Sequence, residues 1–423
     1  MTRRRRRAAG ALVGCALLTG CPAPVERAPE PSATSQPADA LPGRPTGASI
    51  ELPAYDGPPP DAPPSRGPLA TVIAAVDLTP ATPGVFARTA GVVAAPGGGA
   101  YVLLSPQNRA LPQSLVTVDA TGVRGAVPVP RMDAVWGLHV LGDGTVAVTG
   151  QLRVDGRPGY GFQVADPATG GVRTQVTVPA EDGTVSSDGA SAVGGSTLYL
   201  FLTTGTGDGL RDRLLAVDVA SGAVLADRDL AAVVAEASSQ PVGSQLGALV
   251  PRPGGGVTLA FDAPPTEEAT ERIPTLLAFD AALEPVGKPV RATDLSEGAE
   301  IQAVSAAADG TVFLLVEVDE GTWVLAIPDG GGAGPLLGQF EERIYNYALV
   351  VEPAQRWAVL PDPDGVLSLD LTTGEMAGPL EFQCGPRLDV QRIEPGADGV
   401  GAVVVGECDE PREDTQMVWL LGP

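Results

Sequence analysis

The sequence predicts an all-β fold: a seven-bladed β-propeller of four-stranded antiparallel blades, closed by an N-terminal strand that completes the last blade. Two observations predict it. A unit of four short apolar runs recurs at intervals of about 50 residues, as in propeller repeats, and one unpaired strand precedes the first unit. The 54 glycines and 42 prolines favour many short strands and turns. Aromatic residues make up only 4%, so we expect Val, Leu and Ala to fill the core.

Each unit has a first strand, a Gly-rich turn, a second strand, a variable loop, a third strand, a turn and a fourth strand. The seventh unit lacks its fourth strand, whereas residues 69–76 form an apolar run ahead of the first unit. If these residues complete the last unit, the ring closes and leaves no open sheet edge. The units begin near Gly91, Trp136, Ser191, Gly247, Ile301, Tyr347 and Val390.

Several third strands end in an aspartate that a Thr-Gly or Ser-Gly pair follows. Its side chain can accept amide hydrogens further along the turn, and the glycine supplies the left-handed conformation. Because the pattern recurs, we interpret these aspartates as turn residues rather than ligands. The segment from Asp362 to Gly365 looks like a calcium loop but lacks a glutamate at the twelfth position, so we interpret it as a turn too. The recurring aspartates are Asp119, Asp166, Asp218 and Asp370.

This repeat resembles the quinoprotein-like and surface-layer-like β-propellers of bacteria, which share the third strand with its Asp-x-x-Thr-Gly ending. The resemblance covers residues 69–423 and implies the propeller fold. Quinoprotein dehydrogenases also carry a tryptophan four residues after that glycine, and a vicinal cysteine pair. Here Gly170 is followed by Gly171, Val172, Arg173 and Thr174, and no two cysteines are adjacent. We therefore do not expect quinone-dependent dehydrogenation.

Residues 1–20 have the organisation of an export signal. Arg3–Arg7 precede a short apolar run, Ala8–Leu17, which is too short to span a bilayer. The following Leu18-Thr19-Gly20-Cys21 resembles the lipobox of bacterial lipoproteins, which implies cleavage before Cys21 and lipidation of its thiol. We expect the lipid chains to anchor the protein on the outer face of the bacterial cell membrane. A plain secretory signal is the alternative, and the export route stays open.

Residues 21–68 are rich in proline and poor in apolar residues. Such a segment cannot bury enough surface to order itself and favours extended conformations. We predict a disordered tether that lifts the folded domain, residues 69–423, off the membrane. A proline-rich ligand for a partner domain is the alternative.

The charge of the chain limits its partners. The net charge is −24, and removing the five arginines of residues 1–20 takes it to −29. Like charge repels phosphate, so we expect no binding to nucleic acid or to anionic lipid surfaces. A protein or basic peptide on an acidic face is allowed, and we expect a monomer.

Few side chains suit catalysis. His139 is the single histidine and Lys288 the single lysine, and the sequence has no Gly-x-Ser-x-Gly elbow. His139 lies in the first strand of the second unit, whose side chains point between blades in a propeller. We interpret it as a core histidine, with a catalytic base as the alternative.

Two cysteines remain after export, because Cys15 leaves with the signal and Cys21 is lipidated. Cys384 lies in the loop that leads into the seventh unit, and Cys408 follows that unit's second strand. Since the first two strands run in opposite directions, both cysteines emerge on the same face. We predict a disulfide between Cys384 and Cys408, which fits an oxidising compartment; two free thiols are the alternative.

The same face carries the loops that lead into each blade, and acidic residues gather there. They could hold a divalent cation near the central opening, as in the calcium-dependent propeller lactonases, or a basic peptide; solvated loops are the alternative. The best-placed metal ligands are Asp133, Asp188, Glu300 and Asp389. The other acids are Glu181, Asp182, Glu267, Glu268, Glu271, Asp294, Glu297, Glu341, Glu342, Glu407, Asp409, Glu410, Glu413 and Asp414.

These observations favour a membrane-anchored extracytoplasmic lipoprotein whose propeller is a binding or scaffolding module for a protein or other ligand. We expect no enzymatic activity and no cofactor. The alternative is a calcium-dependent, lactonase-like hydrolase that uses the four carboxylates. A glycan-binding envelope protein is a third hypothesis, with Trp136, Tyr345 and Tyr347 as the loop aromatics.

Overall fold

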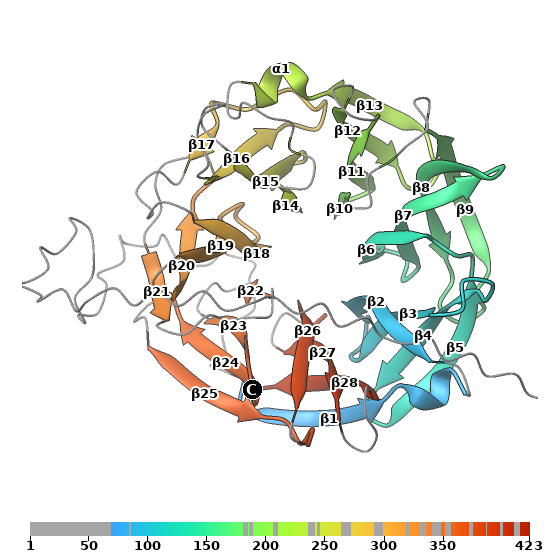
Figure 1. Ribbon diagram of the computed structural model, residues 1–423, viewed down its shortest axis with the longest axis vertical. Coiled ribbons are helices and arrows are strands. Elements are labelled where there is room, and N and C mark those ends of the chain that lie inside the picture. Colours follow the sequence, from blue (N-terminus) through green and yellow to red (C-terminus); the bar gives the residue numbers. More distant parts are fainter. Residues whose placement is uncertain are drawn as a thin grey trace, which may run out of the picture. The chain divides into compact units, whose positions relative to one another are not determined.

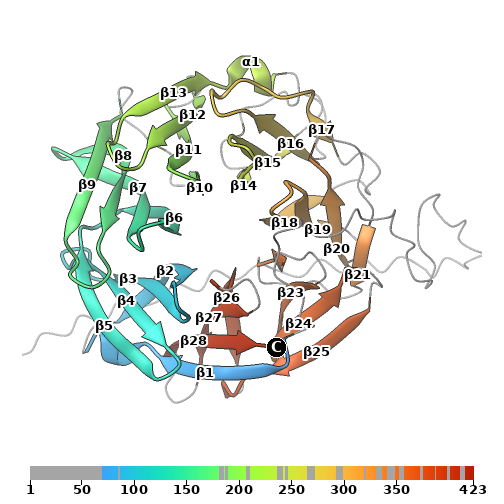
Figure 2. The ribbon, with the colours of Figure 1, turned by 180° about the vertical axis from the view of Figure 1, so that it is seen from behind.

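A computed structural model of the chain shows seven four-stranded antiparallel sheets arranged as the blades of a ring (Figures 1 and 2). The described residues all belong to one compact unit, Pro45–Pro423. The structure describes residues 69–423 except 84–85, 181–184, 186–188, 206–209, 236–241, 243–245, 264–271, 292–298, 319–320, 330–335, 341–347, 352–356, 372–374, 386, 398–400 and 410–414.

Each of blades 1 to 6 contains four consecutive strands, and the first of them is innermost (Figure 1). Blade 1 contains β2 (Ala87–Ala94), β3 (Ala100–Pro106), β4 (Gln113–Asp119) and β5 (Gly122–Val129). Blade 2 contains β6 (Ala134–Val140), β7 (Val146–Val154), β8 (Arg157–Ala165) and β9 (Val172–Pro179). Blade 3 contains β10 (Ala190–Gly194), β11 (Thr197–Thr204), β12 (Arg211–Asp218) and β13 (Val224–Asp229).

The second half of the ring repeats this order. Blade 4 contains β14 (Leu246–Pro251), β15 (Val257–Ala263), β16 (Ile273–Phe279) and β17 (Val290–Arg291). Blade 5 contains β18 (Glu300–Ala306), β19 (Val312–Val318), β20 (Gly321–Ile327) and β21 (Leu336–Phe340). Blade 6 contains β22 (Val350–Val351), β23 (Trp357–Asp362), β24 (Gly365–Asp370) and β25 (Met376–Glu381).

Blade 7 combines the two ends of the domain, in the strand order β26 (Leu388–Pro395), β27 (Ala402–Cys408), β28 (Thr415–Gly422) and β1 (Thr71–Asp77). Strand β1 pairs antiparallel with β28, from Thr71 opposite Gly422 to Asp77 opposite Met417. The predicted closure of the ring by an N-terminal strand is therefore confirmed, as is the predicted seven-bladed fold.

The hydrophobic core is divided among the interfaces between blades. Seven clusters of buried side chains each combine residues of two neighbouring blades. Between blades 3 and 4, for example, Phe201 of β11 and Phe261 of β15 belong to one cluster. Between blades 7 and 1, Val418 and Val102 do so. Because every strand of a blade presents one face to each neighbour, this division follows from the alternation of side chains along a strand.

The recurring aspartates close turns, as predicted. The Asp119 Oδ1 accepts the backbone N–H of Thr121 at 2.7 Å, and the Asp218 Oδ1 accepts that of Ser221 at 2.8 Å. Asp166 does the same with Ala168 at 2.8 Å. The turn after Asp370 lies outside the described residues.

Inner strands pair on one side only, so some of their amides need partners elsewhere. Side chains of the preceding blade provide them. The Gln416 Oε1 of blade 7 accepts the Thr89 N–H of blade 1 at 3.1 Å and the Thr89 hydroxyl at 2.9 Å. The two Asp262 carboxylate oxygens of blade 4 accept the Ile301 N–H of blade 5 at 3.0 and 3.1 Å. These bonds fix the position of each inner strand against its neighbour.

Helical structure is limited, among the residues that the structure describes, to η1 (Thr79–Ala81) and α1 (Ala231–Val234). Within the same part of the chain, no helix has the length and apolarity that crossing a bilayer requires.

Candidate functional site

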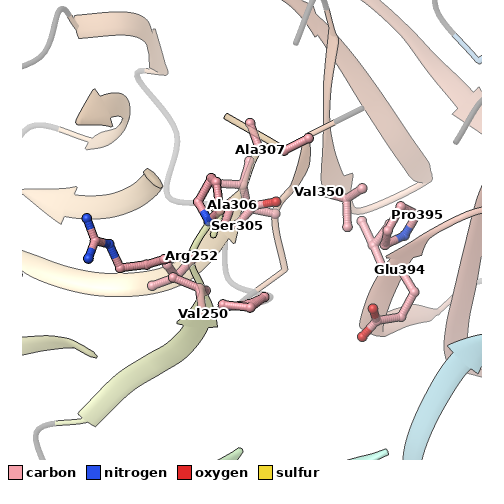
Figure 3. Close-up of a pocket in the computed structure, with 14 residues that line it drawn as sticks. Val250, Arg252, Ser305, Ala306, Ala307, Val350, Glu394 and Pro395 are labelled. Atoms are coloured by element: carbon pink, nitrogen blue, oxygen red, sulfur yellow. The ribbon is translucent and has the colours of Figure 1, made fainter. Parts of the chain in front are cut away.

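A cavity of about 480 Å³ lies where the inner strands of blades 4 to 7 end (Figure 3). It is bordered by β14, β18, β22 and β26 together with the residues that adjoin them. Small side chains at Ala306, Ala307 and Ala308 leave room between these elements. The other lining residues are Val250, Pro251, Arg252, Pro253, Val304, Ser305, Leu349, Val350, Ile393, Glu394 and Pro395.

Two of the three polar side chains in this lining already have partners. The Arg252 guanidinium donates to the Asp329 carboxylate at 2.6 and 3.2 Å and to the Phe279 carbonyl at 3.4 Å. In Figure 3 it extends away from the other labelled residues. The Ser305 hydroxyl accepts the Val351 N–H at 3.2 Å. Neither group needs a ligand to satisfy it.

Glu394 is the third polar side chain, and it differs from Arg252 and Ser305 in its lack of a bonding partner among the described residues. Among the described residues, none forms a hydrogen bond or an ion pair with its carboxylate. Burial raises the pKa of Glu394 to about 7, although Arg392, two residues earlier on β26, acts to lower it. A half-buried carboxylate without partners carries a desolvation cost that a suitable ligand would relieve.

The predicted metal ligands lie at the other end of the inner strands. Asp133 directly precedes β6, Glu300 begins β18 and Asp389 is the second residue of β26. The Asp133 carboxylate lies 3.3 Å from Nε of Arg153, and that of Glu300 lies 3.7 Å from Arg272. Asp188 lies outside the described residues. Within the described part of the chain, no three His, Cys, Asp or Glu side chains are grouped so that they could hold a metal ion.

Only some of the acidic residues predicted to gather on one face of the ring belong to the described residues. Glu407, expected in a loop, is instead in β27, where its carboxylate accepts hydrogen bonds from Gln391 at 3.0 Å and Gln416 at 3.2 Å. The aromatic residues Tyr345 and Tyr347 lie outside the described residues. So do Glu181, Asp182, Glu267, Glu268, Glu271, Asp294, Glu297, Glu341, Glu342, Glu410, Glu413 and Asp414.

His139 lies in β6 and joins two blades. Its Nε2 lies 2.8 Å from the Ser191 hydroxyl of β10, which lies 2.7 Å from the Thr149 hydroxyl of β7. A Cβ on Gly137 would come within 2.6 Å of the His139 ring, so the glycine makes room for this group. Burial lowers the pKa of His139 to about 4, which keeps the imidazole neutral near pH 7. The interpretation as a core histidine agrees with this geometry.

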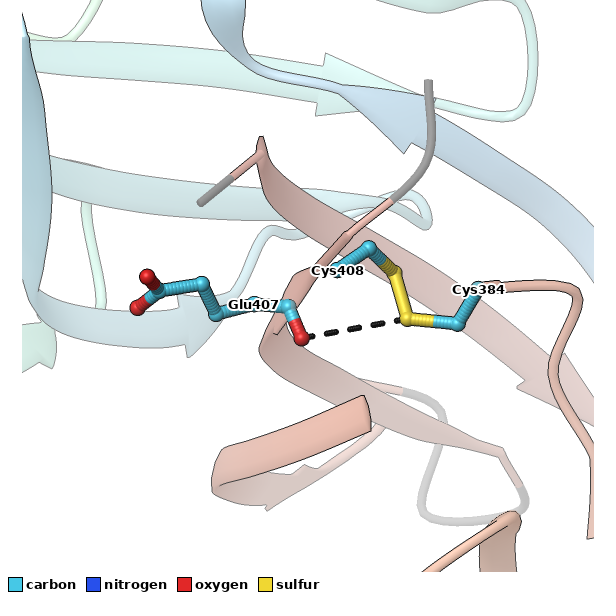
Figure 4. Close-up of a disulfide and its surroundings, with 3 residues drawn as sticks. All are labelled: Cys384, Glu407 and Cys408. Carbon is cyan, nitrogen blue, oxygen red and sulfur yellow. Dashed lines mark hydrogen bonds between the residues drawn. A yellow bond between two sulfur atoms is a disulfide. The ribbon is translucent and has the colours of Figure 1, made fainter. Parts of the chain in front are cut away.

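The two cysteines of blade 7 lie at disulfide distance, with their Cα atoms 5.0 Å apart (Figure 4). Cys408 is the last residue of β27, and Cys384 lies between β25 and β26. Beside them the rings of Phe382 and Trp419 stack at 4.5 Å. The structure thus places the pair as the prediction requires. Cys21 lies outside the described residues.

Two carboxylates whose pKa is raised were not among the predicted site residues, namely Glu394 and Asp262. Burial raises the pKa of Asp262 to about 7, the Ile301 N–H lowers it, and the neighbouring Glu300 raises it further. Asp262 occurs in an apolar run followed by Pro-Pro, and Glu394 alternates with apolar residues in a strand. An acidic residue within such a run is the signal that could have identified both.

No protein-family model matches the sequence of this chain, and no curated protein matches it.

Proposed function

We propose that this chain is a membrane-anchored extracytoplasmic lipoprotein whose β-propeller binds a ligand at the centre of its ring. The Leu18-Thr19-Gly20-Cys21 motif after a basic and then an apolar segment supports the anchor. The proline-rich residues 21–68 support a tether between the anchor and the propeller. Both features would hold a binding module at the membrane without embedding it.

The observation that carries the binding function is the cavity at the ends of β14, β18, β22 and β26. Its volume of about 480 Å³ falls in the range of roughly 300–1,000 Å³ that is typical of ligand sites. Its lining combines many apolar side chains with few polar ones, which is the usual composition of such sites. Because regular strands of four blades build the walls, the site is held on rigid elements.

Native mass spectrometry of the protein purified from the membranes of its own host tests this function. We expect the wild type to retain a ligand that adds to the mass of the polypeptide. Ala308→Trp should lose this ligand, because the exposed Ala308 lines the cavity and an indole there would occupy it. Ala168→Trp, in an exposed turn of blade 2, is the matched control and should keep the ligand.

Two further experiments test the lipid anchor and the alternative function as a hydrolase. Cys21→Ser should move the protein from the membrane to the soluble fraction. Addition of calcium should leave the melting temperature unchanged, whereas saturable stabilisation by several degrees would favour a cation site and the hydrolase.

A wild type that retains no ligand in native mass spectrometry, or a ligand that Ala308→Trp retains equally, would refute the proposed binding at the cavity.

A further inference from the structure

We propose that the cavity binds an alkylammonium group, with the Glu394 carboxylate as its counter-ion and the apolar lining in contact with the hydrocarbon part. This inference rests on the proposed binding function and adds the chemical class of the ligand.

The balance of charge in the cavity favours a cation. Arg252 and Glu394 are the two charged side chains in the lining, and the Arg252 charge is compensated by Asp329 at 2.6 Å. Among the described residues, no ion pair joins Glu394 to a cation, and the exposed Arg392, two residues earlier on the same strand, lowers its pKa only in part. In Figure 3 the Glu394 carboxylate lies apart from the other labelled residues and on the far side from Arg252. The uncompensated charge is therefore negative.

Hydrogen bonding favours an ammonium group among cations. An ionised carboxylate only accepts hydrogen bonds, and no described residue donates one to Glu394. An ammonium group brings three donors and a positive charge, so it would satisfy the carboxylate directly. A divalent metal ion would need several oxygen ligands, and among the described residues no three His, Cys, Asp or Glu side chains are grouped so that they could hold one.

The rest of the lining favours an aliphatic body on the ligand. The residues that line the same cavity as Glu394 include the branched apolar Val250, Leu349, Val350 and Ile393, which are 5–8% exposed. Contact of hydrocarbon with the exposed part of this apolar wall stabilises a complex. The raised pKa of Glu394 agrees with this environment, because an apolar surrounding disfavours an uncompensated carboxylate. A bound ammonium would lower that pKa again.

An alkylammonium group can come from a small amine or from a lysine side chain, and the experiment separates these sources. Isothermal titration calorimetry at pH 8 would use the full propeller with n-hexylamine, hexan-1-ol and the peptide acetyl-Gly-Lys-Gly-amide. We expect n-hexylamine to bind at least about tenfold more tightly than hexan-1-ol, because a hydrogen bond to a charged group contributes about 1.5–3 kcal/mol. Binding of the peptide at similar strength would indicate a lysine side chain as the source.

Two glutamate variants locate the binding. Glu394→Gln should weaken n-hexylamine binding about tenfold or more and leave hexan-1-ol binding unchanged. Glu381→Gln removes the same charge from an exposed position on β25 and should change neither. Lowering the pH from 8 to 5.5 should weaken n-hexylamine binding to the wild type, because Glu394 then takes up a proton. A thermal melt of each variant checks that it is folded.

Different results would refute the ammonium site and the binding function of the cavity. If hexan-1-ol binds as tightly as n-hexylamine and Glu394→Gln changes nothing, the ammonium site is wrong while the cavity remains a binding site. If neither amine probe binds but the wild type retains a ligand that Ala308→Trp loses, the inference alone is overturned. If no probe binds and no ligand is retained, both proposals are overturned.

Discussion

At two interfaces, the one between blades 7 and 1 and the one between blades 4 and 5, a side chain of one blade accepts the backbone N–H of the next blade's inner strand. The two side chains that do so differ in their chemistry. At the first, the neutral Gln416 accepts the Thr89 N–H at 3.1 Å; at the second, Asp262 accepts the Ile301 N–H at 3.0 Å. Both side chains are buried. Only Asp262 can change its charge, so the two interfaces should respond differently to pH.

The direction of that response follows from the pKa of Asp262. Burial raises it from 3.8 to about 7, so the folded protein binds more protons at this site than the unfolded chain between these two values. The free energy of unfolding contributed by Asp262 is fully present below pH about 4 and is lost as the pH rises to about 7. Glu394 acts in the same direction. His139 acts oppositely, because its lowered pKa of about 4 adds stability as the pH rises towards 6.5.

The largest effect is expected from Asp262→Asn. Between pH 4 and 7 the wild type should lose up to about 4 kcal/mol more free energy of unfolding than the variant. Urea denaturation at several pH values measures this difference, in which the contributions of His139 and Glu394 cancel. Gln416→Glu is the complementary variant and should introduce a pH dependence at the other interface. Parallel curves for the wild type and Asp262→Asn would show that Asp262 does not titrate in this range.

The next effect concerns Cys384 and Cys408, which belong to the cluster between blades 6 and 7. Cys408→Ala should lower the free energy of unfolding by about 3 kcal/mol, because the cross-link joins residues 24 positions apart in the chain. The loss should be similar at pH 5 and pH 7.5, in contrast to that of Asp262. Wild-type protein with reductant is the control, since it keeps both side chains. If reductant leaves the denaturation curve unchanged, the thiols are free.

The smallest effect is expected from Gln416→Ala, about 2 kcal/mol near pH 7. The substitution removes the acceptor of both the Thr89 amide and the Thr89 hydroxyl, together with the donor to Glu407, and a buried group left unsatisfied costs about 1–3 kcal/mol. Chemical denaturation measures it against Thr89→Val, which removes only the hydroxyl and should cost about half as much. Equal costs for the two variants would mean that the Thr89 amide does not depend on Gln416.

The fold could be predicted because its determinants are local or repeated. The turn at Asp218 is specified by Asp-x-x-Ser-Gly alone, and the alternation of apolar residues specifies each strand. The closure by β1 followed from counting strands. The seventh unit lacked its fourth strand, and the apolar run at residues 69–76 belonged to no unit. The positions of Cys384 and Cys408 followed from the opposite directions of two adjacent strands.

The cavity could not be predicted in this way, because its lining comes from four blades. Glu394 and Val250 are distant in sequence, and no pattern in either segment refers to the other. Asp262 likewise depends on the backbone amide of Ile301 in the next blade, and every residue except proline has such an amide. The sequence favoured acids in loops, whereas the two carboxylates with a raised pKa, Asp262 and Glu394, lie in strands. Their chemistry follows from their burial, which the number of acids in a segment does not reveal.

The pairing of β1 with β28 also determines when the domain can fold. Strand β1 must wait for β28, which the ribosome makes more than 300 residues later, since Thr71 pairs with Gly422. Contacts so distant in sequence form slowly, and until they form, blade 7 remains without its outer strand. Val76 of β1, which is buried in the closed ring, is then an apolar surface open to aggregation. The ring is therefore complete only after β28 has been made, although most of its blades are built from strands that are neighbours in sequence.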